Sequence, residues 1–183
     1  PLVARPLRFE VRQRRFVNGE PAVALDEGDV RAAVEACAAE GVEAIAICFL
    51  HSYLDAADEE RAAAIAREAA PSIHVTTSSD VVREYKEYER FSTAALNAYV
   101  MPVMDRYLQR LESRLSEAGY REPIEMMKSS GGLMRASTAR RYPVETLLSG
   151  PAAGVMGAIH VAERSGFRNL ITYDMGGTST DVA

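Results

Sequence analysis

The sequence has only two cysteines and no tryptophan, and it contains no long uninterrupted run of apolar residues. Cys37 and Cys48 are isolated and lie in apolar surroundings, so they favour a reduced, cytoplasmic protein over a disulfide-linked one. A membrane-spanning helix needs about 20 consecutive apolar residues, and no such segment is present. Basic residues are not in excess, because 21 Lys and Arg stand against 26 Asp and Glu. The sequence therefore predicts neither a membrane span nor a nucleic-acid partner.

Helices and strands alternate in the first half of the chain, which is typical of an α/β fold. Asp26 is expected to cap a helix over residues 26–40, which carries an apolar stripe. A nearly continuous apolar run over residues 42–50 predicts a strand that is covered on both faces. A second helix over residues 56–70 and a short strand over residues 73–77 follow. The composition, 48% hydrophobic and 26% charged, is that of a globular protein.

The remaining elements are predicted from turn residues and periodicity. The Asn18-Gly19 pair indicates a hairpin, whose arginines at positions 12, 14 and 15 are expected to face solvent. The further predicted elements are a solvated, charged helical face over residues 81–88, a helix over 92–117 that Pro102 kinks or restarts, a strand over 123–128, a short helix over 136–141, a strand over 144–148 and a helix over 149–165.

The most informative stretch is residues 173–182, Tyr-Asp-Met-Gly-Gly-Thr-Ser-Thr-Asp-Val. The apolar run over residues 170–173 predicts a buried strand that ends at Asp174. Glycines at positions 176 and 177 let the backbone turn sharply and approach a ligand closely. Consecutive N–H groups in such a turn suit a phosphate, and an acidic residue beside them suits a hydrated Mg²⁺. The alternative is an ordinary hairpin with solvated aspartates.

These residues resemble the second phosphate loop of the actin, heat-shock chaperone and sugar-kinase superfamily. More narrowly, they resemble the hydantoinase A/5-oxoprolinase family. The resemblance continues in three upstream segments: residues 148–158 (Leu-Ser-Gly-Pro-Ala-Ala-Gly-Val-Met-Gly-Ala), residues 127–132 (Met-Lys-Ser-Ser-Gly-Gly), and the segment over residues 87–102 that begins Glu-Tyr-Glu-Arg.

The resemblance implies an α/β fold, namely a ribonuclease-H-like (actin-like ATPase) lobe with a mixed sheet and flanking helices. The chain would then be a fragment of a two-lobe enzyme. Residues 1–148 would be the C-terminal portion of the first lobe, residues 149–168 the helix that connects the lobes, and residues 169–183 the first hairpin of the second lobe.

The implied function is that of an ATP-dependent hydrolase, which opens a cyclic amide or imide such as a hydantoin or 5-oxoproline through a phosphorylated intermediate. The implied cofactors are ATP and Mg²⁺. A second hydantoinase-B-like subunit or domain and an oligomer are expected, and the isolated fragment is expected to be inactive. Two alternatives stay open: a subunit of an acetone or acetophenone carboxylase, and a non-catalytic scaffold.

The resemblance also assigns candidate site residues. Asp174, Thr180 and Asp181 are the catalytic candidates, and Asp174 would hold Mg²⁺ through water. The candidates for ATP binding are Gly150, Gly154, Gly176, Gly177, Thr178 and Ser179. The candidates for a substrate cleft are Glu87, Glu89, Arg90, Asn97, Ser129, Ser130 and Gly131. His51 follows a predicted strand, and its role is left open between loop packing and a ligand cleft.

Overall fold

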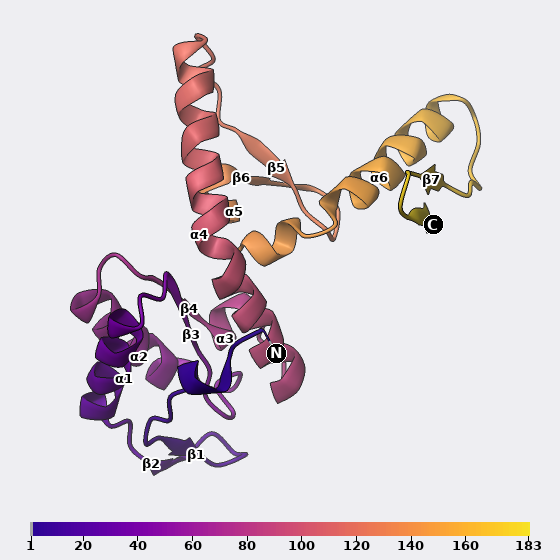
Figure 1. Ribbon diagram of the computed structural model, residues 1–183. Coiled ribbons are helices and arrows are strands. Elements are labelled where there is room, and N and C mark those ends of the chain that lie inside the picture. The colour runs from indigo at the N-terminus through magenta and orange to yellow at the C-terminus, as the bar shows by residue number, and fades with distance from the viewer. Residues whose placement is uncertain (1) are drawn as a thin grey trace. The chain divides into compact units, whose positions relative to one another are not determined.

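The computed structural model describes residues 2–183, which divide into two compact units, residues 2–106 and residues 107–183 (Figure 1). The strands of the described residues pair in four two-stranded sheets, of which one is parallel and three are antiparallel. Helices accompany these sheets along the chain. The predicted α/β class, with strands of mixed direction and flanking helices, is confirmed.

The first unit begins with a short 3₁₀ helix, η1 (Arg5–Leu7), and the predicted hairpin of β1 (Arg14–Arg15) and β2 (Pro21–Val23). Gly19 makes the turn with a φ of +87°, which favours glycine. The prediction that Arg15 faces solvent is wrong. Its side chain is buried and forms ion pairs with Asp55 at 2.6 Å and Asp58 at 2.7 Å, which attach the hairpin to the region around the start of α2.

The centre of the first unit is a parallel βαβ unit. Strand β3 (Ala44–Ile47) pairs in register with β4 (His74–Thr77), and α2 (Ala57–Ala69) connects them. Helix α1 (Glu27–Ala39) packs beside α2, and the apolar side chains of both helices form the core with β4. The core residues are Val30, Val34, Ala62, Ala63, Ile65, Ala66, Ala70 and Val75. The predicted cap is present, because the Asp26 side chain accepts a hydrogen bond from the backbone of Asp29 at 3.0 Å.

Two helices follow β4. The short α3 (Ser78–Val81) is succeeded by residues without helical structure, so the predicted helical face over residues 81–88 is wrong for most of its length. Helix α4 (Glu87–Glu117) begins five residues earlier than predicted and continues through Pro102 without restarting. Its first turn carries Glu87 and Glu89, which the helix dipole favours at this end.

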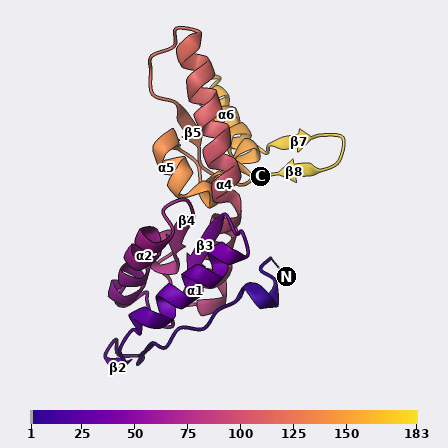
Figure 2. The same ribbon diagram turned by 60° about the vertical axis from the view of Figure 1, so that its left-hand side comes forward.

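The second unit contains the end of α4, two hairpins, short helices and the longer α6 (Figure 2). Strands β5 (Glu125–Met127) and β6 (Leu133–Arg135) form a hairpin that leads into α5 (Ala136–Arg141). The 3₁₀ helix η2 (Pro143–Thr146), the long α6 (Ser149–Arg164) and the hairpin of β7 (Tyr173–Met175) and β8 (Thr180–Val182) complete the unit.

Two strand predictions for the second unit are wrong. Residues 144–148 do not form a strand, because Pro143 fixes a helical φ at the first position of η2, and the Thr146 hydroxyl donates to the Pro143 carbonyl at 2.7 Å. The strand predicted over residues 170–173 begins only at Tyr173 and is not buried, since Ile171 is 81% exposed. Among residues 2–183, no third strand pairs with the β7–β8 hairpin, which leaves both of its outer edges without a neighbouring strand.

Within residues 2–183, no helix has both the length and the apolar character needed to cross a membrane.

Candidate functional site

The glycine-rich turn joins β7 to β8 and aligns the two aspartates of the motif. Asp174 stands directly opposite Asp181, and Met175 stands opposite Thr180. The Gly176 N–H group donates to the Ser179 carbonyl at 3.0 Å and closes the turn. Directly opposed residues of an antiparallel pair project from the same face, where two like charges repel each other. The hairpin therefore presents two exposed carboxylates in a position that a cation would stabilise.

The carboxylate of Asp174 also lies close to α6. A Cβ atom added to Gly154 would stand 4.0 Å from Asp174 Oδ2, while a Cβ on Gly150 would meet nothing within 4 Å. Neither glycine fills the space beside the helix, so the first two turns of α6 leave the carboxylate open on that side. In the part of the chain that the structure describes, no hydrogen bond or ion pair occupies the Asp174 side chain.

The turn itself offers hydrogen-bond donors. Within residues 2–183, the amide groups of Gly177 and Thr178 donate to no protein atom. The hydroxyl groups of Thr178 and Ser179 stand in the same exposed turn. Exposed N–H groups next to a carboxylate are a suitable set for an anion with its counter-cation, such as a phosphate with Mg²⁺.

The second glycine-containing loop, residues 128–132, is a tight turn between β5 and β6. Gly131 and Gly132 both have left-handed φ angles, +84° and +79°. The Ser129 N–H group donates to the Glu145 carbonyl at 2.7 Å, and Lys128 Nζ lies 2.7 Å from Glu145 Oε2. The sequence prediction included Ser129, Ser130 and Gly131, but it missed this lysine–glutamate pair.

Both candidate loops touch α6, but they do so on different sides. A Cβ on Gly131 would lie 3.9 Å from the sulfur of Met156, whereas Asp174 lies beside Gly154. Residues 154 and 156 are about 200° apart around an α-helix, because each residue turns the helix by about 100°. The structure therefore does not bring Ser129–Gly131 together with Asp174 around one point.

The cleft candidates of the first unit differ in exposure. Arg90 and Asn97 are completely buried, Glu87 is half-buried and Glu89 is exposed. Asn97 Nδ2 donates to Thr76 Oγ1 at 3.1 Å, which attaches α4 to β4. Buried polar groups need such partners, so this contact accounts for the asparagine on the apolar side of the helix.

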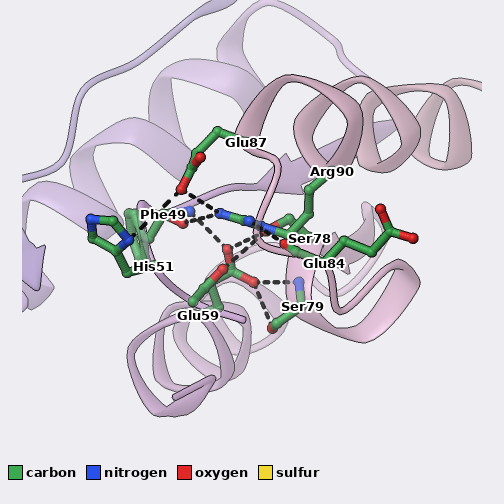
Figure 3. Close-up of polar contacts among 9 residues, drawn as sticks. Phe49, His51, Glu59, Ser78, Ser79, Glu84, Glu87 and Arg90 are labelled. Carbon is green, nitrogen blue, oxygen red and sulfur yellow. Dashed lines mark hydrogen bonds and ion pairs between the residues drawn. The ribbon is translucent and has the colours of Figure 1, made fainter. Parts of the chain in front are cut away.

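Arg90 is fixed by the protein on all sides (Figure 3). It donates to the Glu84 carbonyl at 2.6 Å, the Phe49 carbonyl at 3.1 Å and Ser78 Oγ at 3.2 Å. Its guanidinium carbon also lies 5.5 Å from the centre of the Tyr53 ring and 5.2 Å from that of Phe91. These contacts join the start of α4 to the end of β3.

Glu59 is the buried residue that sequence reasoning missed. Its carboxylate accepts four hydrogen bonds, two from Ser79, one from the Phe49 N–H group and one from the Ser78 hydroxyl, at 2.6 to 2.8 Å. Because Ser78 gives its only hydroxyl proton to Glu59, the Ser78 oxygen accepts from Arg90 and from Ser52. A signal was available in the sequence, because Glu59 continues the buried stripe of Ala62, Ala63 and Ala66 on α2.

Glu87 stands next to this buried network. Its Oε1 atom lies 3.7 Å from Arg90 Nη2 and 3.8 Å from Nδ1 of His51 (Figure 3). Arg90 holds the carboxylate from the protein side. His51, whose role the sequence left open, contacts it from the segment that follows β3. The structure thus brings Glu87, Arg90 and His51 together, whereas Glu89 points into solvent.

Two family models match the sequence. The model described as "Hydantoinase/oxoprolinase" matches residues 90–183, and the model described as "Hydantoinase/oxoprolinase N-terminal region" matches residues 1–70. Together they match the chain except for residues 71–89.

Curated relatives match over almost the whole chain. The caprolactamase subunit alpha of Pseudomonas jessenii is 37% identical over 99% of this chain and 26% of its own length. The acetophenone carboxylase gamma subunit of Aromatoleum aromaticum is 35% identical over 100% of this chain and 25% of its own length. The 5-oxoprolinase of Saccharomyces cerevisiae is 38% identical over 86% of this chain and 12% of its own length. The chain spans about a quarter or less of the length of these relatives.

Solved structures share the fold. The ATP-dependent caprolactamase of Pseudomonas jessenii superposes with a TM-score of 0.91 at 37% identity, over 98% of this chain and 26% of that chain. The nucleotide-free acetone carboxylase superposes with a TM-score of 0.80 at 30% identity, over 94% of this chain and 25% of that chain.

Proposed function

Because the chain belongs to the hydantoinase/oxoprolinase family, we propose that it is a segment of an ATP-dependent hydrolase that opens a cyclic amide or imide. The substrate class includes hydantoins, 5-oxoproline and lactams. The names of the caprolactamase and 5-oxoprolinase relatives support this class. The chain on its own is expected to be inactive, because it spans only about a quarter of the caprolactamase subunit.

The observation that carries the proposal is the geometry of the β7–β8 hairpin. Asp174 and Asp181 carry directly opposed carboxylates, and Asp174 lies beside Gly154 of α6, which leaves the space open. Within residues 2–183, the N–H groups of Gly177 and Thr178 donate to no protein atom. A carboxylate oxygen is a ligand that Mg²⁺ prefers. The residues present therefore fit a magnesium–phosphate group, with Asp174 holding the metal through water.

Each part of the hairpin has a separate task in this proposal. Gly176, Gly177, Thr178 and Ser179 bind phosphate oxygens through backbone and hydroxyl groups, while Gly150 and Gly154 leave room for the nucleotide. Thr180 and Asp181 orient the loop or an attacking water. ATP supplies the phosphoryl group that activates the amide oxygen of the substrate, so the protein's contribution is mainly positioning and charge neutralisation.

A carboxylase subunit is the second candidate. The acetophenone carboxylase relative is 35% identical over the whole chain, close to the 37% of the caprolactamase relative. The two candidates share the phosphate site and differ in the substrate that is activated. Product analysis with ATP and either a lactam or a ketone plus bicarbonate distinguishes them: only a hydrolase yields a ring-opened amino acid.

The surroundings of the enzyme are also part of the proposal. Several relatives are described as subunits, which supports a second, hydantoinase-B-like subunit or domain and an oligomeric enzyme. The first lobe would contain residues 1–148, the connecting helix would be residues 149–168, and the second lobe would begin with residues 169–183. We place the enzyme in the cytoplasm.

Asp174→Asn in the intact enzyme tests the phosphate site. We expect Mg-ATP binding measured by calorimetry to weaken at least tenfold, and turnover to fall by orders of magnitude. Glu163→Gln is the matched control, since it removes an exposed carboxylate from α6 of the same unit. Equal nucleotide affinity in Asp174→Asn and the unmodified enzyme would refute the assignment of the hairpin to phosphate binding.

A further inference from the structure

The backbone of His51 is left-handed, a conformation that few residues other than glycine adopt. Its φ is +61°, and among residues 2–183 only Leu148 shares a positive φ without being glycine. A left-handed conformation is strained for residues other than glycine, and such strain clusters at functional sites. His51 also follows β3 at the carboxyl end of the parallel β3–β4 pair, the edge at which α/β sheets bind ligands.

The side chain of His51 faces the carboxylate of Glu87. Its Nδ1 atom is buried, makes no hydrogen bond within the described residues and lies 3.8 Å from Glu87 Oε1. Glu87 is also attracted by the buried Arg90, whose Nη2 atom lies 3.7 Å from the same oxygen. Hydrogen bonds between catalytic groups are often long before a ligand binds and tighten afterwards.

We propose that His51 and Glu87 form a proton-transfer dyad, in which the carboxylate holds the proton on Nδ1 and leaves the lone pair on Nε2. The hydrogen bond made by one ring nitrogen decides which nitrogen carries the proton. Figure 3 shows the second nitrogen of the ring directed away from Glu87 and Arg90. The His51 side chain is 21% exposed, so this nitrogen is the accessible end of the dyad.

The step that the dyad performs rests on the proposed ring-opening function. Nε2 accepts a proton from water while the water oxygen forms a bond to the amide carbon. The Glu87 carboxylate stabilises the imidazolium that results. His51 then returns the proton to the ring nitrogen as the carbon–nitrogen bond breaks, which leaves the phosphoryl group on the new carboxyl group as an acyl phosphate. A second water hydrolyses this acyl phosphate to the carboxylate and inorganic phosphate, and the dyad is then in its starting state. Arg90 is a positioning residue, since it acts only through Glu87.

The chain provides a matched control in His74. Its Nε2 atom lies 3.9 Å from Asp105 Oδ2, so it also faces a carboxylate, and its side chain is 31% exposed. However, His74 lies in β4 and has no left-handed backbone. If the His51–Glu87 contact only packed elements together, replacing His51 and replacing His74 should have similar effects on the activity of the enzyme.

Kinetics of the intact enzyme test the dyad with His51→Asn, Glu87→Gln and His74→Asn. Asparagine tolerates a left-handed φ better than most residues, so His51→Asn should keep the fold. General acid–base catalysis contributes about 100-fold or more. We expect kcat for ring opening to fall at least 100-fold in His51→Asn and at least tenfold in Glu87→Gln. KM should stay within threefold, and His74→Asn should match the unmodified enzyme.

The pH profile separates catalysis from packing. Among the described residues, three charged or titratable groups face the His51 ring. Glu87 and, behind it, Arg90 come from α4, and Tyr53 comes from the same segment as His51. We expect kcat of the unmodified enzyme to fall at acidic pH, because a protonated Nε2 cannot accept a proton, and His51→Asn to lose this dependence. A kcat within threefold of normal and an unchanged profile in His51→Asn would overturn the dyad.

A spectroscopic measurement tests the dyad independently of the proposed function. If the enzyme opens no lactam, the proposed function is refuted, but the protonation of His51 can still be measured. The 183-residue chain contains three histidines, so nitrogen-15 spectra of its imidazoles can be assigned with His51→Asn and His74→Asn. We expect neutral His51 to carry its proton on Nδ1, and Glu87→Gln to reduce the population of this tautomer. A proton on Nε2 in the unmodified chain would contradict the dyad.

Discussion

The Oδ2 atom of Asp174 lies 4.0 Å from the position that a Cβ atom on Gly154 would occupy. This distance is an ordinary van der Waals contact, so a methyl group would fit beside the carboxylate without displacing it. It would nevertheless take the place of any water or ligand atom on that side. Gly154 thus connects helix stability to the chemistry proposed for the hairpin.

Gly154→Ala should therefore separate stability from binding. Alanine in the middle of a helix is about 0.5–1 kcal/mol more favourable than glycine, and we expect the free energy of unfolding to rise by about this amount. Mg-ATP affinity of the intact enzyme should fall, because the methyl group lies against Asp174. Gly157→Ala is the control, since a Cβ there meets nothing within 4 Å. If both variants gain stability and bind nucleotide equally well, Gly154 has no role in the site.

Glu59→Ala should destabilise the first unit strongly. The substitution leaves the Phe49 and Ser79 N–H groups and two hydroxyls without their acceptor, and removing one partner of a buried charged network costs about 3–5 kcal/mol. Urea unfolding of the chain measures this change. Glu60→Ala, at the exposed neighbouring position, should change the free energy of unfolding by about 0.5 kcal/mol or less. Similar effects for the two variants would show that the buried network contributes little.

Acid should weaken the attachment of the N-terminal hairpin. Burial alone would raise the pKa of Asp58, but hydrogen bonds from Arg15 and Gln13 lower it below its usual value. Nearby, hydrogen bonds from Arg12 lower the pKa of Asp29 to about 2. A carboxyl with a lowered folded-state pKa contributes stability above its unfolded pKa, about 3.9, and this stability is lost as the pH falls further.

We therefore expect the free energy of unfolding to decrease between about pH 4 and pH 2, and Asp58→Asn to lose part of this decrease. Urea unfolding at pH 6 and at pH 3 gives the comparison. Glu35→Gln serves as a control, because it removes a carboxylate from an exposed position of α1 in the same unit. The same loss of stability with acid in Asp58→Asn and the unmodified chain would exclude the Arg15–Asp58 pair as its cause.

Elements with a local cause were predictable from the sequence. Asp26 caps α1 through a residue three positions away, and Gly19 closes a hairpin with its own left-handed φ. The pattern of apolar residues gave both strands of the parallel pair, although β3 is shorter than its apolar run. Such features depend on side-chain chemistry within a few residues, and the sequence displays that chemistry directly.

The sequence predictions were wrong where the structure depends on residues far away in the chain or on the backbone constraint of one proline. Arg15 looked like a solvated arginine because its partners, Asp55 and Asp58, lie about 40 residues away. The apolar residues 144–148 looked like a strand, but Pro143 starts a 3₁₀ helix there. In the candidate site, periodicity indicated that Arg90 is on a helix, but only the fold shows that it is buried against Ser78.

The four hydrogen bonds to Glu59 also favour the observed alignment of β4 with β3 during folding. They reach from α2 to the residues that directly follow β3 and β4, Phe49 at one end and Ser78 and Ser79 at the other. If β4 slipped by one position along β3, the serines would move away and the buried carboxylate would lose three of its four hydrogen bonds. Misaligned forms of the βαβ unit are therefore penalised by charge as well as by packing, which favours a single alignment of β3 with β4.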